Sequence, residues 1–330
     1  MNILLTGGAG YVGSACLRWL LRHGHNPFAY DNLSTGNDWS VPRERLIRGD
    51  ILDIAPLCHC LTSLNIEGVI HLAALSVVNE SLGRPGEYWR INVAGTKNVL
   101  DAMSQCGVER LLFSSSCAVY GDSHQGPITE FTPCQPAHPY GATKLAAENM
   151  IRDYTRKYRL GSTILRYFNV AGADMDGQFG EAHVNETRLI PLILSVAAGA
   201  RDKVHIYGDD WPTRDGTCIR DFVHCEDLAC AHQLAIETTR PGECRTYNVA
   251  TGTGVTVKEV LAACENVVGR PIPRTTTGRR RGDPHTLYAL ADRITAELRW
   301  RPRLARIDDI VRTAWNWHKR SANTRSRMAA

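Results

Sequence analysis

The sequence predicts an α/β fold, built on a doubly wound parallel sheet and followed by a smaller α/β region. Three observations support this prediction. Short apolar runs of strand length alternate with stretches of helical periodicity through the first half of the chain. A glycine cluster at residues 7–13 separates the first run from the first helical stretch, and the second run leads into Asp31. Such alternation implies parallel strands joined by right-handed crossovers.

The first element pair predicts a dinucleotide site. Residues 3–5 are a strand-length apolar run, and residues 11–23 carry apolar side chains at helical spacing. The glycines between them fit G-x-G-x-x-G through Gly8, Gly10 and Gly13, and Gly7 adds a second spacing. Glycines here permit a tight turn and let the backbone approach a pyrophosphate, while the helix start aims free N–H groups at that anion. We expect contacts from Gly7, Gly10, Tyr11 and Val12.

Asp31 indicates which dinucleotide binds. It follows an expected strand at residues 26–30 and lies about 20 residues beyond the glycines, where a ribose-binding carboxylate belongs. A carboxylate accepts hydrogen bonds from ribose hydroxyls and repels a 2′-phosphate. No Arg or Lys lies between Asp31 and Arg43, so we predict NAD rather than NADP. The polar loop from Asn32 to Gly36 could close over the adenosine.

The next elements extend this Rossmann-type sheet. We expect strands at 45–48, 68–71 and 110–113, and helices at 52–64 and 85–106. Ligands bind beyond the carboxyl ends of parallel strands. The residues found there are Asp50, Ile51, Leu72, Ala73, Ala74, Ser114 and Ser116.

The second half is less regular. We expect helices at 139–159, 189–198, 226–238, 257–268 and 308–319, strands at 163–167, 204–207 and 247–249, and a long loop at 169–186. Residues 1–168 are therefore predicted to form the NAD-binding domain. Residues 169–330 are predicted to form mainly the substrate-binding domain, with some segments returning to the sheet and a flexible tail at 321–330.

Composition excludes several classes of protein. The 330 residues are 43% hydrophobic and 22% charged, an ordinary globular profile. A net charge of +4 is too small to imply a nucleic-acid partner, and no apolar run approaches the ~20 residues that span a bilayer. The eleven cysteines are scattered and form no C-x-x-C motif. The N-terminal residues are predicted to form a core strand. We therefore expect reduced thiols, no metal site and a cytoplasmic location.

Tyr140 and Lys144 are the strongest catalytic candidates. They stand at i and i+4 near the start of a predicted helix, so both lie on one face. A lysine ammonium beside a phenol favours the phenolate, and we expect it to lower the Tyr140 pKa toward neutrality. Such a tyrosine can act as general base toward a substrate hydroxyl. Ser116 could bridge that hydroxyl and the phenol.

These motifs resemble the extended short-chain dehydrogenase/reductase family, and within it the epimerases of nucleotide sugars. The similarity is carried by residues 6–14, 31–34 and 114–116, Tyr140 with Lys144, and residues 165–169. Residues 208–224 and 279–284 are the most discriminating, and the similarity runs from residue 2 to about 318.

The resemblance implies NAD-dependent 4-epimerisation of UDP-hexoses, UDP-glucose and UDP-galactose. Tyr140, as phenolate, would take the proton from the hexose 4-OH, directly or through Ser116. The C4 hydride would move to NAD, giving a transient 4-keto sugar and NADH, and would return to the opposite face. NAD is then regenerated in each cycle and stays tightly bound. A homodimer through helices 85–106 and 139–159 is also implied.

The residues above and the resemblance together define the expected contacts. For NAD they are Gly7, Gly10, Tyr11, Val12, Asp31, Asn32, Asp50, Ile51, Leu72, Ala73, Ala74, Asn92, Ser114, Tyr140, Lys144 and Tyr167. For the UDP-sugar they are Ser116, Tyr140, Asn169, Arg188, Leu189, Arg220, Arg280, Asp283 and Leu287. Arginine suits a diphosphate because its planar fork makes paired charged hydrogen bonds.

Three positions depart from the family pattern. Arg188 stands where many relatives carry Asn or His, and Ser76 where some carry a lysine. Leu287 stands where some carry a bulky tyrosine near the sugar's C2 substituent, so we expect some tolerance of UDP-N-acetylhexosamines.

Two alternatives remain open at this point. The protein could be a 4-epimerase of UDP-pentoses or UDP-uronic acids, or a non-catalytic NAD-sensing protein. A dehydratase or decarboxylase is disfavoured, because Cys117 and Ala118 stand where a catalytic acid would be expected.

Overall fold

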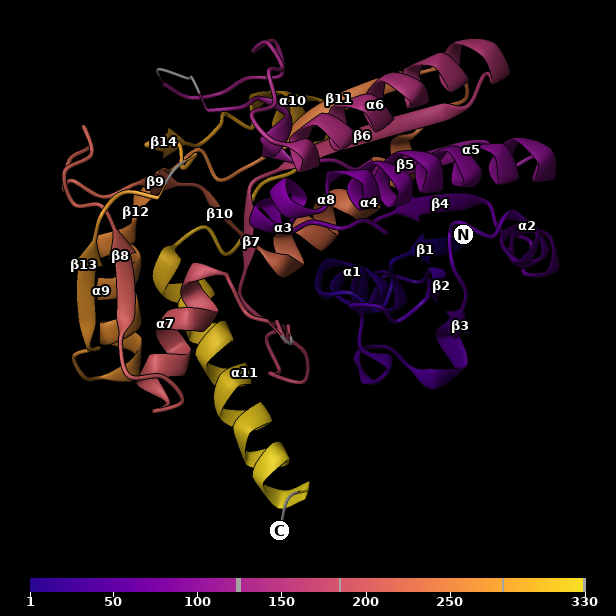
Figure 1. Ribbon diagram of the computed structural model, residues 1–330. Coiled ribbons are helices and arrows are strands. Elements are labelled where there is room, and N and C mark those ends of the chain that lie inside the picture. The colour runs from indigo at the N-terminus through magenta and orange to yellow at the C-terminus, as the bar shows by residue number, and fades with distance from the viewer. Residues whose placement is uncertain (123–125, 184, 281, 329–330) are drawn as a thin grey trace.

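A seven-stranded parallel sheet forms the centre of the computed structural model, which describes residues 1–122, 126–183, 185–280 and 282–328. The strand order is β11-β6-β5-β4-β1-β2-β3 (Figure 1). The strands are β1 (Asn2–Thr6), β2 (Asn26–Asp31), β3 (Leu46–Arg48), β4 (Gly68–His71), β5 (Arg110–Ser114), β6 (Gly161–Tyr167) and β11 (Cys244–Val249). This confirms the predicted doubly wound α/β fold.

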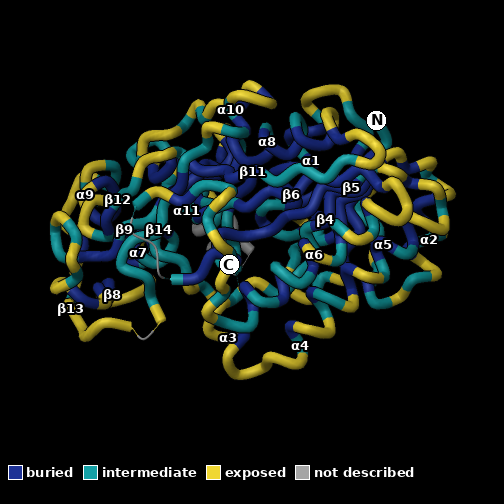
Figure 2. Tube along the Cα trace, turned by 90° about the horizontal axis from the view of Figure 1, so that it is seen from above, coloured by how far each residue is buried: buried dark blue, intermediate teal, exposed yellow. Residues whose placement is uncertain are grey.

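Helices cover both faces of the sheet. On one face lie α1 (Tyr11–Arg22), α8 (Cys225–Thr238) and α10 (Asp292–Leu298), which share a buried apolar cluster with β1 and β11. On the other lie α2 (Ile54–Ser63), α5 (Gly95–Cys106) and α6 (Pro139–Tyr158), packed in a second cluster. Figure 2 shows β4, β5, β6 and β11 buried between these layers. Burial on both faces explains the near-continuous apolar runs of β1, β4 and β5.

The expected helix at 85–106 is not a uniform α-helix. It consists of α4 (Pro85–Trp89), a π-helical turn at Arg90–Ala94, and α5. Asn92 lies within the π-helical turn, and turns of this kind are often found at functional sites. A short helix, α3 (Val78–Gly83), precedes α4 and was not predicted.

The smaller region lies to the left of the sheet in Figure 1. It contains α7 (Leu189–Ala197), α9 (Val257–Val268) and α11 (Ile307–Met328), with β8 (Val204–Tyr207) paired to β13 (Arg274–Thr277). Three two-residue strands, β9 (Ile219–Arg220), β12 (Val255–Thr256) and β14 (Thr286–Leu287), form another small sheet. β7 (Asn169–Ala171) pairs with β10 (Phe222–His224), at the start of the expected loop 169–186.

The second half of the chain returns to the sheet, as expected. β11 pairs in parallel with β6 over its whole length. A division into domains at residue 168 stays a prediction about folding units.

The C-terminal helix is longer than the predicted helix at 308–319. α11 continues to Met328, so residues 321–328 of the predicted tail are helical. The sequence there contains no Pro or Gly that would end the helix. Among the residues that the structure describes, no helix is both long and apolar enough to cross a membrane.

Candidate active site

A cavity of about 1080 Å³ opens beyond the carboxyl ends of the strands, between the sheet and the smaller region. This is the edge where open parallel sheets bind ligands. Every site residue predicted from the sequence lines this cavity except Asn92 and Ser114. Residues separated by up to 280 positions in the chain, from Gly7 to Leu287, therefore meet at one site.

The two exceptions lie behind the cavity wall. The Asn92 amide donates to the Leu75 carbonyl and accepts from the Leu75 N–H, at 3.0 and 2.8 Å. The Ser114 hydroxyl bonds His232 Nε2 at 2.9 Å, and the Ser114 carbonyl accepts from Lys144 Nζ. Both side chains are buried and are bonded to the protein. These bonds hold the cavity wall in position, and contact of either residue with the cofactor stays a prediction.

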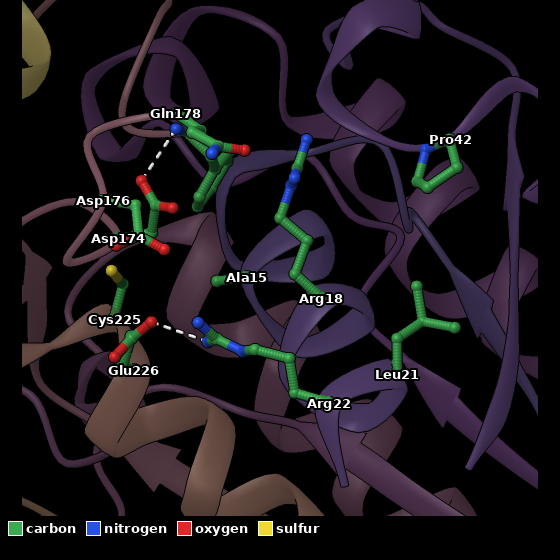
Figure 3. A pocket seen from close by; sticks show the side chains of 11 residues that line it. Ala15, Arg18, Leu21, Arg22, Pro42, Asp174, Asp176, Gln178, Cys225 and Glu226 are labelled. Atoms are coloured by element: carbon green, nitrogen blue, oxygen red, sulfur yellow. Dashed lines mark hydrogen bonds and ion pairs between the residues drawn. The ribbon is translucent and has the colours of Figure 1, made fainter. Parts of the chain in front are cut away.

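A second cavity of about 220 Å³ lies between α1 and the start of α8 (Figure 3). Its charged groups are bonded within the chain. Arg22 forms an ion pair with Glu226 at 2.6 Å, and Arg18 Nε donates to the Ser40 carbonyl at 3.2 Å. None of the predicted site residues lines this cavity.

The glycine loop has the geometry that a dinucleotide requires. Gly7 has a φ of +71°, and a Cβ there would lie 2.6 Å from Ala73 N. A Cβ on Gly13 would lie 2.2 Å from the Gly7 carbonyl oxygen, so Gly13 lets the helix start pack on the turn. Gly7, Gly10 and Gly13 line the cavity, whereas Gly8 packs on Ala29 of β2. The spacing G-x-x-G-x-x-G is thus the one that faces the ligand space.

The start of α1 offers backbone donors to an anion. No side chain among the described residues caps α1 at Gly10, and the helix begins at Tyr11 beside the cavity. Its first N–H groups have no intrahelical partner. The residues present therefore fit the diphosphate of a dinucleotide.

Asp31 fits the ribose of that dinucleotide. It is buried at the end of β2, and its two oxygens accept from the N–H groups of Ala9 and Leu33 at 2.9 and 2.8 Å. Burial raises the pKa of the carboxyl, and these two hydrogen bonds oppose that rise. Each oxygen keeps further acceptor capacity for a hydroxyl. Asn32 Nδ2 donates to Asp50 Oδ2 at 2.9 Å, which joins two predicted cofactor residues.

Tyr140 and Lys144 lie in the first two turns of α6. Pro139 starts the helix and His138 Nδ1 accepts from Gly141 N at 3.2 Å, so the position of the first turn is well defined. Lys144 Nζ donates to the Ser114 carbonyl at 2.9 Å and lies 4.9 Å from the centre of the Phe113 ring. The pair therefore faces the end of β5, where Ser116 also lines the cavity.

One expectation about this pair is wrong. Burial raises the pKa of Tyr140 to about 12, while hydrogen bonding to Ser116 and the charge of Arg188 oppose that rise. Burial also lowers the pKa of Lys144 to about 7. Burial away from water disfavours both the phenolate and the ammonium. Lys144 therefore does not lower the Tyr140 pKa toward neutrality. Periodicity places the two residues on one face and gives no measure of their burial.

Glu148 is a positioning residue that sequence reasoning missed. It stands one turn after Lys144 on the same face of α6 and is fully buried. It accepts from Ser115 Oγ at 2.6 Å and from Arg166 Nε at 2.9 Å. Arg166 also donates to the Tyr120 hydroxyl at 3.1 Å. The i, i+4, i+8 spacing of Tyr140, Lys144 and Glu148 was the available signal.

The opposite wall of the cavity carries the predicted arginines. Arg220 of β9 pairs with Leu287 of β14, so these two residues stand side by side. The Arg280 guanidinium lies 4.1 Å from the centre of the Tyr207 ring. Arg279 instead forms an ion pair with Asp210, and Arg281 lies outside the described residues.

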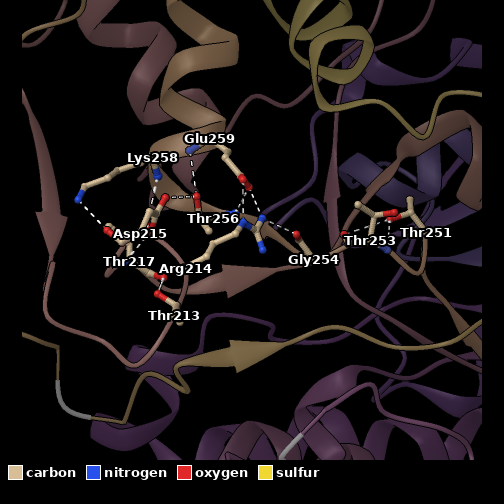
Figure 4. Close-up of polar contacts among 10 residues, drawn as sticks. All are labelled: Thr213, Arg214, Asp215, Thr217, Thr251, Thr253, Gly254, Thr256, Lys258 and Glu259. Atoms are coloured by element: carbon tan, nitrogen blue, oxygen red, sulfur yellow. Dashed lines mark hydrogen bonds and ion pairs between the residues drawn. The ribbon is translucent and has the colours of Figure 1, made fainter.

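A polar network holds the loop that precedes β9 (Figure 4). Arg214 forms an ion pair with Glu259, and Asp215 accepts from Thr256 Oγ1 and from Thr217 N. Thr256 and Glu259 also form a capping box at the start of α9. These contacts tie residues 214–217 to α9 and so position Arg220, which explains part of the discriminating motif at 208–224.

Comparison with known proteins agrees with this arrangement. The model of the NAD dependent epimerase/dehydratase family matches residues 3–250. The chain belongs to this family.

Relatives within the family are similar over nearly their whole length. The UDP-glucose 4-epimerase of Corynebacterium glutamicum is 48% identical over 96% of this chain and 95% of that protein. The enzyme of the same name from Halalkalibacterium halodurans is 44% identical over 97% and 96%. A crystal structure of the Bifidobacterium longum UDP-glucose 4-epimerase with NAD+ and UDP has a TM-score of 0.92 and 35% identity, covering 98% of this chain and 99% of that one.

Arg188, a predicted substrate residue, is bonded to groups of the segment that precedes α7. Its guanidinium bonds Glu181 at 2.5 Å and also contacts His183 Nε2, and its N–H donates to Glu186 at 2.8 Å. Ligand atoms of Glu181, His183 and Glu186 lie within 4.8 Å of one another, a spacing that could suit a metal ion. The Arg188 guanidinium already bonds Glu181 and His183, so it explains why these groups lie close together without a metal ion.

Proposed function

We propose that the protein catalyses the NAD-dependent 4-epimerisation of UDP-hexoses, interconverting UDP-glucose and UDP-galactose. One observation carries the proposal. A single cavity joins a dinucleotide loop, the Tyr140–Lys144 pair with Ser116, and the two arginines of the opposite wall. A cofactor, a proton-transfer group and an anion clamp are the parts that this reaction needs.

The cofactor residues divide into two groups. Backbone N–H groups at Tyr11 and Val12 would hold the NAD diphosphate, with Gly10 in the turn beside them, and Asp31 would hold the adenosine ribose. Lys144 would hold the nicotinamide ribose. When bound, oxidised NAD would supply the hydride acceptor and the positive charge of its nicotinamide ring.

Tyr140 is proposed as the proton-transfer group. At neutral pH its phenol is protonated, because burial raises its pKa to about 12. A cation brought close to the phenol favours the phenolate, and Arg188 already acts in that direction. The phenolate then takes the proton from the hexose 4-OH, directly or through Ser116, and later returns it.

The remaining residues are proposed to bind the UDP portion. Arg220 and Arg280 would clamp the diphosphate, with Asn169, Arg188 and Leu189 along the same wall, and Asp283 would accept the uridine ribose hydroxyls. Strong binding of UDP and weak binding of the sugar allow the 4-keto ring to turn over and present its other face.

The test uses the protein as purified. Without added NAD, it should convert UDP-galactose into UDP-glucose, identified by chromatography and mass spectrometry. Tyr140→Phe should abolish turnover by removing the proton-transfer oxygen, whereas Tyr158→Phe, an exposed tyrosine of the same helix, should leave it unchanged. Substantial turnover by Tyr140→Phe would refute the assignment of the base.

We also propose tolerance of UDP-N-acetylhexosamines, because Leu287 lines the cavity beside Arg220 and is smaller than tyrosine. A structural relative named as a UDP-Glc/GlcNAc 4-epimerase from Campylobacter jejuni shares 35% identity, with a TM-score of 0.83. UDP-GalNAc, UDP-xylose and UDP-glucuronic acid should be assayed together. Turnover of a pentose or uronic acid alone would favour the alternative substrates, and turnover of no UDP-sugar would favour NAD sensing.

Assembly as a homodimer completes the proposal. Helices 85–106 and 139–159 would form the interface. Exposed apolar side chains lie at the start of the first segment, on α4 (Trp89), and on α3 just before it (Val78 and Leu82). Light scattering should give twice the chain mass of 36.5 kDa. We propose a cytoplasmic location, since the structure describes all eleven cysteines and each is a free thiol.

A further inference from the structure

The loop after β2 is folded over the glycine turn. Asn37 N and Ser40 Oγ both donate to the Ala9 carbonyl, at 3.0 and 2.9 Å. A Cβ at Gly36 would lie 3.0 Å from Asp31 Oδ1, so the loop passes directly beside the ribose-binding carboxylate. Asn32, Ser34 and Thr35 of the same loop line the cavity. The loop therefore forms part of the cavity wall beside Asp31.

A second segment, from the other half of the chain, holds this loop in place. The Asn37 side-chain amide donates to the Ala182 carbonyl at 3.2 Å. Trp39, which is 48% exposed, stacks on Trp317 of α11, with ring centres 5.7 Å apart and an interplanar angle of 23°. Trp317 Nε1 in turn donates to the Glu181 carbonyl at 3.0 Å.

The Trp317 ring packs closely on the backbone at Gly180. A Cβ at Gly180 would lie 2.4 Å from Trp317 Cδ1, so only glycine lets the segment pass beneath the ring. In Figure 1 the segment that precedes α7 lies between α11 and the N-terminal part of the chain. The three elements are thus joined at one place, outside the cavity.

The same segment reaches the substrate side. Glu181, whose carbonyl accepts from Trp317, bonds the Arg188 guanidinium through its carboxylate at 2.5 Å. Glu181 and Arg188 both line the cavity. The contact with the cofactor loop therefore belongs to a continuous chain of bonds that ends at a residue proposed to face the UDP-sugar.

We propose that Asn37, Trp39 and Trp317 form a clasp that positions the 32–40 loop over bound NAD and slows its release. The inference rests on the proposed function for its cofactor. Three residues outside the cavity thereby help to keep NAD bound between catalytic cycles, and the stack of Trp39 on the partly buried Trp317 has a role beyond packing.

The test measures NAD release directly, without a sugar substrate. The protein, loaded with NAD, is diluted into an excess of an NAD-consuming coupled dehydrogenase, and release is followed as consumption of the freed cofactor. Trp39→Ala and Trp317→Ala should each speed release by about 2- to 12-fold, the range that corresponds to loss of one aromatic pair. The double variant should be no faster than the faster single variant, because the stack is lost only once.

Two controls separate a clasp from general loosening. Phe131→Ala removes an aromatic side chain that is 89% exposed and should release NAD at the wild-type rate. The thermal midpoint of the NAD-free protein should change little in Trp39→Ala, while its release rate changes. Gly180→Ala keeps both tryptophans and should also speed release, because its Cβ displaces the Trp317 ring.

Wild-type release rates in both tryptophan variants would overturn the clasp. So would additive effects of the two substitutions, accompanied by a matching loss of thermal stability in the NAD-free protein. A wild-type protein that holds NAD but turns over no UDP-sugar would contradict the proposed activity alone, because release is measured without substrate.

Discussion

Replacing Lys144 by Met should make the NAD-free protein more stable at low pH while removing its activity. Lys144 is 4% exposed, and its ammonium has one hydrogen-bond partner, the Ser114 carbonyl, among the described residues. Burial lowers its pKa from 10.5 to about 7, and the charge of Glu148 opposes that change. At about 1.36 kcal/mol per pH unit, the difference corresponds to about 5 kcal/mol of destabilisation when the lysine is charged.

The sign follows from proton binding. Between pH 7 and 10.5 the unfolded chain holds the lysine proton and the folded chain does not, so stability rises with pH across this window. Below pH 7 the lysine is charged in the folded protein too, so burial of its charge destabilises the fold by the full amount. Tyr140 affects the free energy of unfolding only above pH 10, where its raised pKa makes stability fall as pH rises. Tyr140 is present in both the wild type and Lys144→Met, so its effect cancels in the comparison. The difference in free energy of unfolding between variant and wild type therefore reports Lys144 alone between pH 7 and 10.5.

Urea unfolding of the two NAD-free proteins at about pH 6, 8 and 10 measures the effect. Lys144→Met should exceed the wild type by a few kcal/mol at the lowest pH, after loss of about 1 kcal/mol for the hydrogen bond to Ser114. The advantage should vanish near the highest pH. A difference that is independent of pH, or a wild type that is the more stable protein at low pH, would refute the dry environment assigned to Lys144.

Three further predictions concern the cavity walls. Gly13→Ala should abolish NAD retention, measured as cofactor released by acid, because its Cβ would lie 2.2 Å from the Gly7 carbonyl; bound NAD at the wild-type level would contradict this. Glu148→Leu should lower the free energy of unfolding by about 3–5 kcal/mol in urea, because it leaves the buried Arg166 without its carboxylate partner; a change below 1 kcal/mol would contradict it. Leu287→Tyr should reduce kcat/KM for UDP-GalNAc more than for UDP-galactose, and equal losses for both substrates would show that this position does not select the sugar.

The sequence predicted those parts of the fold that depend on local periodicity. β4 and α9 have the expected bounds, because a short apolar run after Gly68 marks the strand and a capping box marks the start of the helix. Strands of two residues, such as β9 and β14, have no periodicity to detect. Their pairing is decided by tertiary contacts, as is the return of β11 to the sheet.

The site residues were predictable by type and position, but not by environment. The glycine loop, Asp31 and the Tyr140–Lys144 pair all face the cavity. The raised Tyr140 pKa could not be foreseen, since it depends on burial by segments distant in sequence. The pairing of Arg188 with Glu181 and the stacking of Trp39 on Trp317 likewise join residues that no local pattern relates.

The central claim is that the hydride removed from C4 is stored at the site and returned to the same sugar. The direct measurement mixes UDP-galactose carrying deuterium at C4 with UDP-galactose carrying a heavy-isotope uracil ring, and lets the protein equilibrate both without added NAD. Mass spectrometry of the UDP-glucose formed should find the deuterium only on molecules with the light uracil ring, with none lost to water. Deuterium on heavy-uracil product, or its exchange with solvent, would contradict the account.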